Sequence, residues 1–298
     1  MALSTRRPAP VPGPMSALPE LGIVPGPVCR VFGMRRSGNH AIINWLQRNA
    51  PGGGAVFFNN CVPGKNPFRS FAMVEVNGRR RPGRAGDDPA SFATQAGDGA
   101  AVIFSYEDAM PNETRKRAVS GDIDEAAIGH EIVICRSFLN WSASLVKKLR
   151  PNPSYTPARR TAIVLRAVET YGKMLELVLE AEALGLTVIQ YDAWHGSPEY
   201  REEVLARLGF AARDNGLGEV QSYGNGSSFQ TEATRAEELR PESRWEAMRA
   251  DTEYRIVLWL AARDAAFCAK LEQVFPEDAA RLAGLATDAP PGLSEVGA

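Results

Sequence analysis

The fold is decided by the stretch Val28-Cys29-Arg30-Val31-Phe32-Gly33-Met34-Arg35-Arg36-Ser37-Gly38-Asn39-His40. Its first five residues favour an extended strand that stops at Gly33. A helical period that begins at Asn39 then places four apolar side chains on one face: Ile42, Ile43, Trp45 and Leu46. Gly33 and Gly38 have the G-x-x-x-x-G spacing, in which backbone N–H groups and a helix N-terminus face a bound phosphate. The stretch therefore predicts a strand, a phosphate-binding turn and a helix.

The two residues after Gly38 distinguish this turn from that of a nucleotide hydrolase. Such an enzyme needs Lys and then Ser or Thr to hold the γ-phosphate and Mg²⁺, whereas this chain has Asn39 and His40. An enzyme that transfers a less charged group can rely on side-chain cations instead of Mg²⁺, and Arg35 and Arg36 supply that charge. A plain turn with two solvated arginines is the alternative interpretation.

Short apolar runs alternate with helical patterns along the chain. Further strands are predicted at residues 55–58, 101–104, 132–135 and 187–191. Helices are predicted at residues 138–150, at 158–184 with Gly185 as the stop, and at 198–208 with Ser197 as N-cap. Strands that are apolar on both faces belong inside a parallel sheet. The pattern predicts an α/β fold, three-layer α/β/α, with a central mostly parallel sheet and a P-loop-like phosphate-binding turn.

Composition divides the chain into one α/β domain with two flexible ends. Residues 1–27 hold seven of the 21 prolines and are predicted to be a leader, residues 28–275 the domain, and residues 276–298 a flexible tail. Residues 59–99 are rich in Gly, Pro and Arg and are predicted to be a long loop. The role of its arginine run, within residues 78–84, stays open between a solvated surface loop and attraction of an acidic acceptor.

The composition also excludes several classes of function. The 298 residues carry 34 basic and 35 acidic side chains, a net charge of -1, so no global field favours nucleic acid. No apolar run reaches the roughly 18 to 20 residues that a membrane-spanning helix needs. The four cysteines form no C-x-x-C pair, which argues against a disulfide scaffold or a zinc ribbon. We expect a cytoplasmic protein without a transmembrane segment or a metal; the oligomeric state stays open.

A second candidate anion site follows the apolar run at residues 132–135. Arg136 stands at the carboxyl end of this predicted strand, and Ser144 lies eight residues further on, about two turns into the next helix. Ligands of doubly wound sheets bind outside the carboxyl ends of the strands. A guanidinium and a hydroxyl there can hold a phosphate group. The alternative is an arginine at the sheet edge and a small serine packed between helices.

Together the two sites resemble the sulfotransferases that use 3′-phosphoadenosine 5′-phosphosulfate. Arg36-Ser37-Gly38-Asn39-His40 is similar to the family's 5′-phosphosulfate loop K-S-G-T-T, with Arg for Lys and with Asn and His for the two Thr. Arg136 and Ser144 match its 3′-phosphate signature, and Val188-Ile189-Gln190-Tyr191-Asp192 looks like a third family segment. The family's late Arg-Lys-Gly loop is not evident; Tyr223-Gly224-Asn225-Gly226-Ser227-Ser228-Phe229 lies in the corresponding region.

This resemblance covers roughly residues 28 to 230 and implies both a reaction and a donor site. The reaction is metal-independent, in-line transfer of a sulfuryl group to the hydroxyl of a small-molecule or glycan acceptor. Arg36 would stabilise the transferring group. The residues that the resemblance assigns to the donor are Arg35, Arg36, Ser37, Gly38, Asn39, His40, Arg136, Ser144, Tyr191, Gly226, Ser227 and Ser228.

Sulfuryl transfer also needs a base for the acceptor's proton, and members of the family use a His or a Glu. Glu107 and Asp108 come just after a predicted buried strand, and we favour Glu107. His40 is the second candidate, because the N-terminal end of a helix disfavours the imidazolium. Paired acidic residues after a strand are also common helix caps. The remaining histidines, His130 and His195, are predicted to be structural.

Two other functions fit the same residues. A P-loop kinase with a degenerate loop would bind ATP with Mg²⁺, which the missing Lys-Ser/Thr pair disfavours. A non-catalytic anion-binding module would keep the fold without turnover, as the two replaced threonines suggest. Sugar, lipid-linked sugar, phenol and peptide acceptors stay open, because acceptor pockets are built from variable loops.

Overall fold

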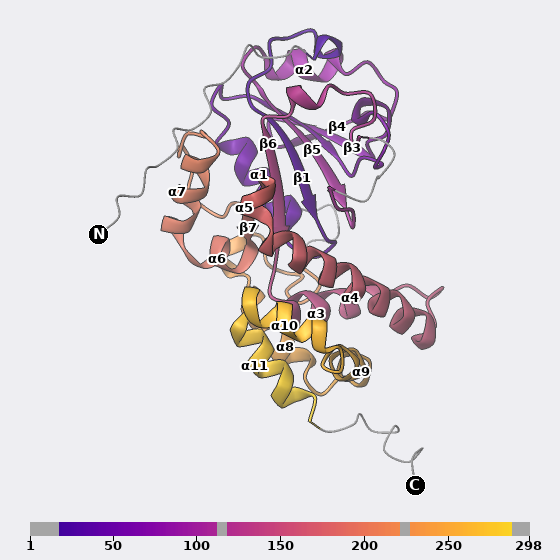
Figure 1. Ribbon diagram of the computed structural model, residues 1–298. Helices are drawn as coiled ribbons and strands as arrows, with labels where there is room; N and C mark the ends of the chain where they lie inside the picture. The colour runs from indigo at the N-terminus through magenta and orange to yellow at the C-terminus, as the bar shows by residue number, and fades with distance from the viewer. Residues whose placement is uncertain (1–17, 112–117, 221–226, 288–298) are drawn as a thin grey trace, which may run out of the picture.

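The computed structural model describes residues 18–111, 118–220 and 227–287. At its centre is a seven-stranded sheet with the strand order β4-β3-β2-β5-β1-β6-β7 (Figure 1). The strands are β1 (Val28–Gly33), β2 (Ala55–Asn59), β3 (Met73–Val76), β4 (Arg79–Arg81), β5 (Ala101–Glu107), β6 (His130–Cys135) and β7 (Thr187–Gln190). The pairings among β2, β5, β1, β6 and β7 are parallel, and those of β3 with β2 and β4 are antiparallel. The predicted α/β class with a mostly parallel sheet is confirmed.

Helices cover the sheet and gather beyond the carboxyl ends of its strands. They are α1 (Asn39–Arg48), α2 (Ala90–Ala96), α3 (Phe138–Leu149), α4 (Pro157–Leu179), α5 (Ala181–Leu184), α6 (Tyr191–Gly196), α7 (Pro198–Arg207), α8 (Arg244–Met248), α9 (Thr252–Ala261), α10 (Ala265–Val274) and α11 (Pro276–Leu285). In Figure 1 the C-terminal helices α8 to α11, in yellow, lie below the strand ends. Within the described ranges, no helix is long and apolar enough to cross a membrane.

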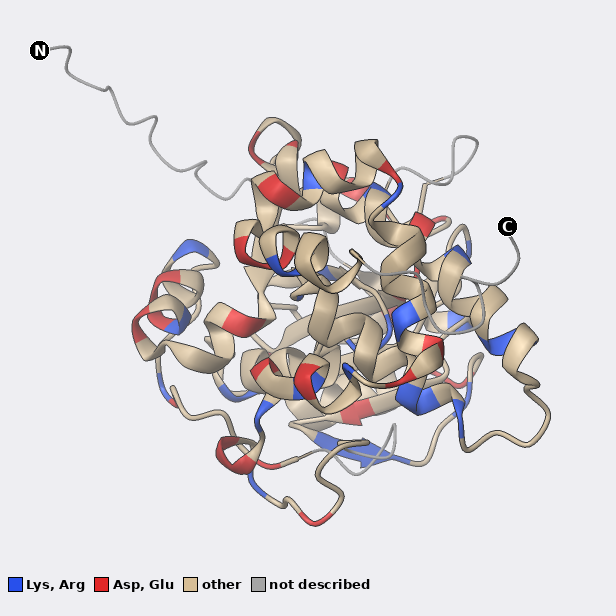
Figure 2. Ribbon diagram, turned by 90° about the horizontal axis from the view of Figure 1, so that it is seen from below, with Lys and Arg blue, Asp and Glu red and all other residues tan. Residues whose placement is uncertain are grey.

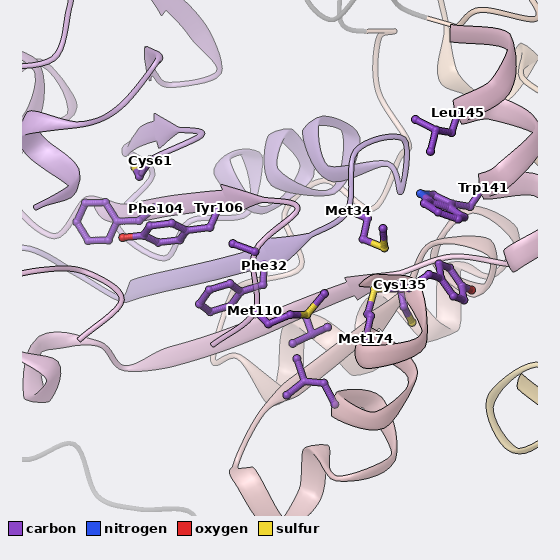
Figure 3. Packing of buried hydrophobic residues seen from close by; sticks show 14 of the residues in the cluster. Phe32, Met34, Cys61, Phe104, Tyr106, Met110, Cys135, Trp141, Leu145 and Met174 are labelled. Carbon is purple, nitrogen blue, oxygen red and sulfur yellow. The ribbon is translucent and has the colours of Figure 1, made fainter. Parts of the chain in front are cut away.

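Successive residues of the central strands pack into two hydrophobic clusters, one on each face of the sheet. Val31 and Ile103 belong to the cluster that α1, α6 and α7 complete. Phe32 and Phe104 belong to the other cluster, which α2, α3 and α4 complete. Figure 3 shows part of this second cluster, where the ring of Phe32 stacks on that of Tyr106 at 5.5 Å between centroids. Burial on both faces is typical of parallel strands and is compatible with the predicted three layers.

The register of the strands brings the candidate residues to one edge of the sheet. Gly33, the last residue of β1, lies opposite Glu107 of β5 and Ile134 of β6. Because these strands are parallel, the segments that follow them leave the sheet on the same side. The β1–α1 turn with Arg36 and the β6–α3 connection with Arg136 are therefore neighbours.

The predicted elements are present, with three local differences. The strand predicted at 101–104 continues as β5 to Glu107, which is its last residue. The pattern at 158–184 is two helices, α4 and α5, which meet at Glu180, and Gly185 ends α5 with a φ of 70°. The extended run 187–191 ends at Gln190, because Tyr191 begins α6. Ser197 caps α7 as predicted: its hydroxyl accepts a hydrogen bond from the Tyr200 amide at 3.0 Å.

The prediction of a long loop over residues 59–99 is wrong for much of its length. β3 and β4 form a hairpin that extends the sheet, and α2 packs against β2 and β3. Asn77 and Gly78 connect the two strands, both with positive φ (52° and 72°), as a tight two-residue turn requires. The four residues of β3 are buried. Burial of this short strand outweighs the Gly, Pro and Arg content on which the loop prediction rested.

Both predicted flexible ends are wrong where the structure describes them. Leu18 and Leu21 of the proposed leader are buried in the core, at 2% and 0% exposure. The proposed tail begins with helix α11, which buries Leu282 and the carboxylate of Asp278. Apolar side chains at these positions bury enough surface to order both segments against the domain. Residues 1–17 and 288–298 lie outside the described residues.

Candidate functional site

A cavity of about 380 Å³ lies where the β1–α1 turn, the end of β5 and the segment after β6 meet. Its walls include Arg36, His40, Glu107, Arg136 and Arg244. This volume lies within the range of about 300–1,000 Å³ that is typical of small-molecule sites. The structure thus brings both predicted arginines and both candidate bases to one cavity.

Two glycines fix the shape of the β1–α1 turn. A Cβ at Gly33 would lie 2.2 Å from Oδ1 of Asn39, and a Cβ at Gly38 would lie 2.0 Å from the ring of Tyr191. Gly38 also has a φ of 91°, which side chains disfavour. The amide of Asn39 donates to the carbonyls of Gly33 and Met34 at 3.3 and 3.2 Å. Asn39 therefore closes the turn with its side chain, while its backbone opens α1.

The neighbouring α3 holds this turn from the other side. Met34 lies beside Trp141 in Figure 3, and the indole nitrogen of Trp141 donates to the carbonyl of Arg35 at 2.9 Å. Ser37 is fully buried and its backbone N–H donates to the Met34 carbonyl at 3.1 Å. Ser37 is one of the residues that the resemblance assigns to the donor, but its backbone N–H already makes a hydrogen bond within the turn. The first N–H groups of α1 have no acceptor within the helix and lie at the cavity.

Three elements hold the backbone at Arg136. The hydroxyl of Tyr171, on α4, donates to the Arg136 carbonyl. The Ser137 amide donates to Asp192, on α6, at 2.7 Å. The Ser137 hydroxyl donates to Asp278, on α11, at 2.8 Å. Because these bonds come from α4, α6 and α11, the position of the Arg136 backbone depends on the packing of several distant elements.

The side chain of Arg136 is buried and lies against the turn. Its Nη1 donates to the carbonyl of Arg36 at 3.1 Å, and its Nη2 donates to the carbonyl of Pro241 at 2.8 Å. Its guanidinium carbon lies 4.8 Å from the ring centre of Tyr191. Its Nε has no hydrogen-bond partner among the described residues. The two bonds use one N–H of each Nη, so they leave the other N–H groups of the guanidinium unengaged.

Sequence reasoning missed Arg244, which begins α8 and is 6% exposed. Its Nη1 donates to the hydroxyl of Ser144 at 2.9 Å, and that hydroxyl donates to the carbonyl of Asn140 at 2.7 Å. Its Nε also lacks a partner in the described parts of the chain. Ser144, predicted to be a ligand, is fully buried and lies behind Arg244. No local motif marks Arg244, because its partner is 100 residues away in sequence.

These arginines form a cluster of like charges. Burial and the neighbouring Arg136 lower the pKa of Arg36, and the same two causes lower the pKa of Arg244 to about 9. With a pKa of about 9 Arg244 stays charged at neutral pH, and the closeness of like charges costs free energy that a bound anion relieves. The cluster therefore favours a ligand with several negative charges.

The two candidate bases lie on the opposite wall of the cavity. Nε2 of His40 is 3.9 Å from Oε1 of Glu107, and each side chain is about three-quarters buried or more. Burial and the charge of Asp108 raise the pKa of Glu107, whereas burial and Arg36 lower the pKa of His40 to about 4. At pH 7 His40 is neutral, and the affinity of Glu107 for a proton is increased.

Arg35 differs from Arg36 in its surroundings. Its side chain is 58% exposed at the cavity wall, and its backbone N–H and Nε both donate to Asp108. Asp108 has a φ of 54°, so the turn after β5 presents its carboxylate to the β1–α1 turn. The pair offsets the charge of Arg35, and Arg36 is the less exposed cation of the turn.

The late serines predicted to contact the donor lie near Arg36. The hydroxyl of Ser228 accepts a hydrogen bond from Nη2 of Arg36 at 3.2 Å. Ser227 lines the cavity, and its hydroxyl accepts from the Gln230 amide at 3.1 Å. The third predicted residue, Gly226, lies outside the described residues.

The other two histidines have structural surroundings, as predicted. The ring of His130 packs edge-on against Phe210, and Nε2 of His195 contacts the carbonyl of Ala236 at 3.2 Å. Burial lowers the pKa of both.

Compared with protein-family models, curated proteins and solved structures, the chain matches none. Among the described residues, no group of three or more His, Cys, Asp or Glu side chains could hold a metal ion. What the site does must be inferred from its own chemistry.

Proposed function

We propose that the chain is a sulfotransferase that moves a sulfuryl group from 3′-phosphoadenosine 5′-phosphosulfate to an acceptor hydroxyl. The main support is that Arg36 and Arg136, which follow separate strands, line one cavity. Nη1 of Arg136 donates to the backbone carbonyl of Arg36 at 3.1 Å. A donor that is anionic at both ends requires such a convergence of cations. The buried like charges of Arg244 and its two neighbours add to this support.

In this proposal the three arginines divide the two ends of the donor between them. Arg36 and the N-terminus of α1 hold the 5′-phosphosulfate, where N–H groups and the helix dipole favour negative charge. Arg136 and Arg244 hold the 3′-phosphate, each through an Nε that has no partner in the described ranges. Ser144 acts on the donor indirectly, because its hydroxyl fixes Arg244. Tyr191 fixes the back of the turn against Gly38.

Glu107 is the proposed base. It takes the proton of the acceptor hydroxyl while the acceptor oxygen forms a bond to sulfur. The bond from sulfur to the 5′-phosphate oxygen breaks, and its electron pair leaves with adenosine 3′,5′-bisphosphate. Arg36 stabilises the charge that develops on this oxygen. A raised pKa makes Glu107 a stronger base than an ordinary carboxylate. Neutral His40 is the second candidate for this role.

Side-chain cations take the place that Mg²⁺ has in a kinase. Arg36, Arg136 and Arg244 supply positive charge, and the turn lacks the Lys-Ser/Thr pair that would bind ATP with Mg²⁺. We expect transfer to continue at full rate in EDTA. Loss of activity on chelation, with recovery on adding Mg²⁺, would favour the kinase alternative.

A thermal-shift comparison tests the donor site. The full chain is melted with adenosine 3′,5′-bisphosphate, with ATP and Mg²⁺, or with adenosine 5′-phosphate. A ligand at 100 times its Kd stabilises the native state by about 2.7 kcal/mol. We expect the bisphosphate to give the largest shift, and Arg136→Ala to remove it.

The control for this comparison is Arg166→Ala, which removes one exposed arginine from α4. An equal shift with all three nucleotides would contradict the proposal. Selective bisphosphate binding without transfer to phenol, sugar or peptide hydroxyls would favour the non-catalytic module. That transfer is followed by the mass gain of the acceptor.

A further inference from the structure

The strand β4 forms an arginine-rich rim at the end of the sheet. Its three residues are Arg79, Arg80 and Arg81; the first two are exposed and the third is half-buried. Figure 2 shows this strand in blue along its length. Arg84, in the segment that follows, has a side chain that is 90% exposed. These four residues are called the arginine edge below.

Most of this charge has no counter-charge within the described ranges. There, no carboxylate lies within ion-pair distance of Arg79, Arg80 or Arg81, and Arg84 has a 3.5 Å contact with Asp87. Glu75 faces Arg80 across the β3–β4 pair, but it is fully buried and accepts from Gln47 at 2.8 Å. Three of the four arginines of the arginine edge therefore have no ion pair among the described residues, on a chain whose net charge is -1.

The arginine edge also has a surface recess. A hollow of about 300 Å³ is lined by Arg80, Arg81 and the Pro82-Gly83 segment. Nε of Arg81 is shielded from solvent and lacks a hydrogen-bond partner in the part of the chain that is described. A Cβ at Gly83 would lie 2.6 Å from Phe92, so the backbone is pressed against the core there. The recess is therefore lined by a backbone segment that packs against the core.

Topology connects this edge with the proposed active site. β3 runs antiparallel to β2 and β4 antiparallel to β3, so β4 points the same way as β2 and β5. The chain leaves β4 after Arg81 on the side of the sheet where Glu107 ends β5. Arg81 lies opposite Val74 of β3, Val74 lies opposite Phe58 of β2, and Phe58 lies opposite Phe104 of β5. Arg81 and Phe104 are therefore at the same level along the strands.

The register also gives the separation between the two sites. β4 and β5 are three strand spacings apart, about 14 Å, and Glu107 lies about 10 Å further along the strand direction than Phe104. The Cα atoms of Arg81 and Glu107 are then roughly 17 Å apart before the sheet twist is included. A small acceptor cannot reach both sites, whereas an extended chain molecule can.

We propose that the arginine edge binds an acidic polysaccharide, one stretch of which presents a hydroxyl to Glu107. This inference rests on the proposed sulfuryl transfer. A carboxylated polysaccharide has the two groups that the surface requires: carboxylates, which match the planar guanidinium fork, and hydroxyls, which accept the sulfuryl group. Nucleic acid suits the surface less well, because one short strand of arginines offers no extended basic face.

Hyaluronan, a carboxylated polysaccharide without sulfate, is the probe for this surface. Its affinity for the full chain is measured by calorimetry at low salt, for wild type and for the triple variant Arg79→Ala/Arg80→Ala/Arg81→Ala. The matched control removes three exposed arginines elsewhere, Arg166→Ala/Arg207→Ala/Arg249→Ala. We expect the edge variant to bind hyaluronan about tenfold more weakly and the control to bind like wild type, since three exposed pairs together contribute roughly tenfold.

Each result has one meaning. Equal hyaluronan binding by the edge variant and wild type would overturn the inference, as would no binding by wild type or tighter binding of an oligonucleotide of similar charge. A melting curve for each variant shows that the fold is kept. Affinity for adenosine 3′,5′-bisphosphate is measured in parallel and should not change in the edge variant. If wild type itself does not bind adenosine 3′,5′-bisphosphate, the sulfotransferase proposal is contradicted. The hyaluronan measurement would still show whether the arginine edge binds a polysaccharide.

Discussion

Replacing Arg136 by Ala gives the most direct measure of the donor site. In the structure Nη1 and Nη2 of Arg136 each donate one N–H to the carbonyls of Arg36 and Pro241, so the other N–H groups of the guanidinium can bond to a phosphate without breaking either bond. One charge-assisted hydrogen bond contributes about 1.5–3 kcal/mol. At about 1.4 kcal/mol per tenfold, we expect Arg136→Ala to raise the Kd for adenosine 3′,5′-bisphosphate roughly 10- to 150-fold.

Isothermal calorimetry on the full chain measures this change, with circular dichroism to confirm that the variant is folded. Arg136→Lys serves as the second variant: it keeps the positive charge but loses the planar fork, so its affinity should lie between those of wild type and Arg136→Ala. Arg166→Ala, with a charge removed from the exposed face of α4, should bind like wild type. An unchanged Kd in folded Arg136→Ala would refute the assignment of Arg136 to the donor.

Three further substitutions test other parts of the site. Glu107→Gln should lower kcat about 10²-fold or more. Glu107→Gln should also raise the melting temperature at pH 7, because the raised pKa of Glu107 means that its ionised form opposes folding. The activity of wild type should fall as the pH drops through that pKa, because Glu107 becomes protonated. Gly38→Ala should lower both stability and bisphosphate affinity, since its Cβ would meet Tyr191 at 2.0 Å; a normal melting curve would contradict this. Asp278→Ala should cost about 2–4 kcal/mol in urea unfolding, because it leaves the Ser137 hydroxyl and the Leu139 amide without acceptors.

The core of the fold could be predicted from local sequence. Runs such as residues 101–104 and 132–135 are apolar at every position, and chains bury such strands between two layers of helices. The turn between Gly33 and Gly38 was also predictable, since the G-x-x-x-x-G spacing stands between a strand pattern and a helix pattern. These features depend on residues within a few positions of one another.

The predictions failed where composition was used in place of pattern. The hairpin at residues 73–81 contains the Asn77-Gly78 turn, a strong local signal that the Gly, Pro and Arg content of the segment obscured. α11 lies in the segment that its composition predicts to be a flexible tail, because Gly, Pro and Ala follow the helix in sequence. Its order comes from Asp278, whose partners Ser137 and Leu139 are about 140 residues away.

The sequence by itself determined the α/β architecture, the shape of the β1–α1 turn and the strand ends that carry Arg36 and Arg136. The tertiary structure alone decided that these two arginines share a cavity, that Arg244 joins them in its wall, and that Ser144 does not line the cavity but bonds to Arg244. The physical reason is the range of the interactions. Strand and turn formation follow from neighbouring residues, whereas a cluster of buried charges arises only when packing brings together segments 100 residues apart.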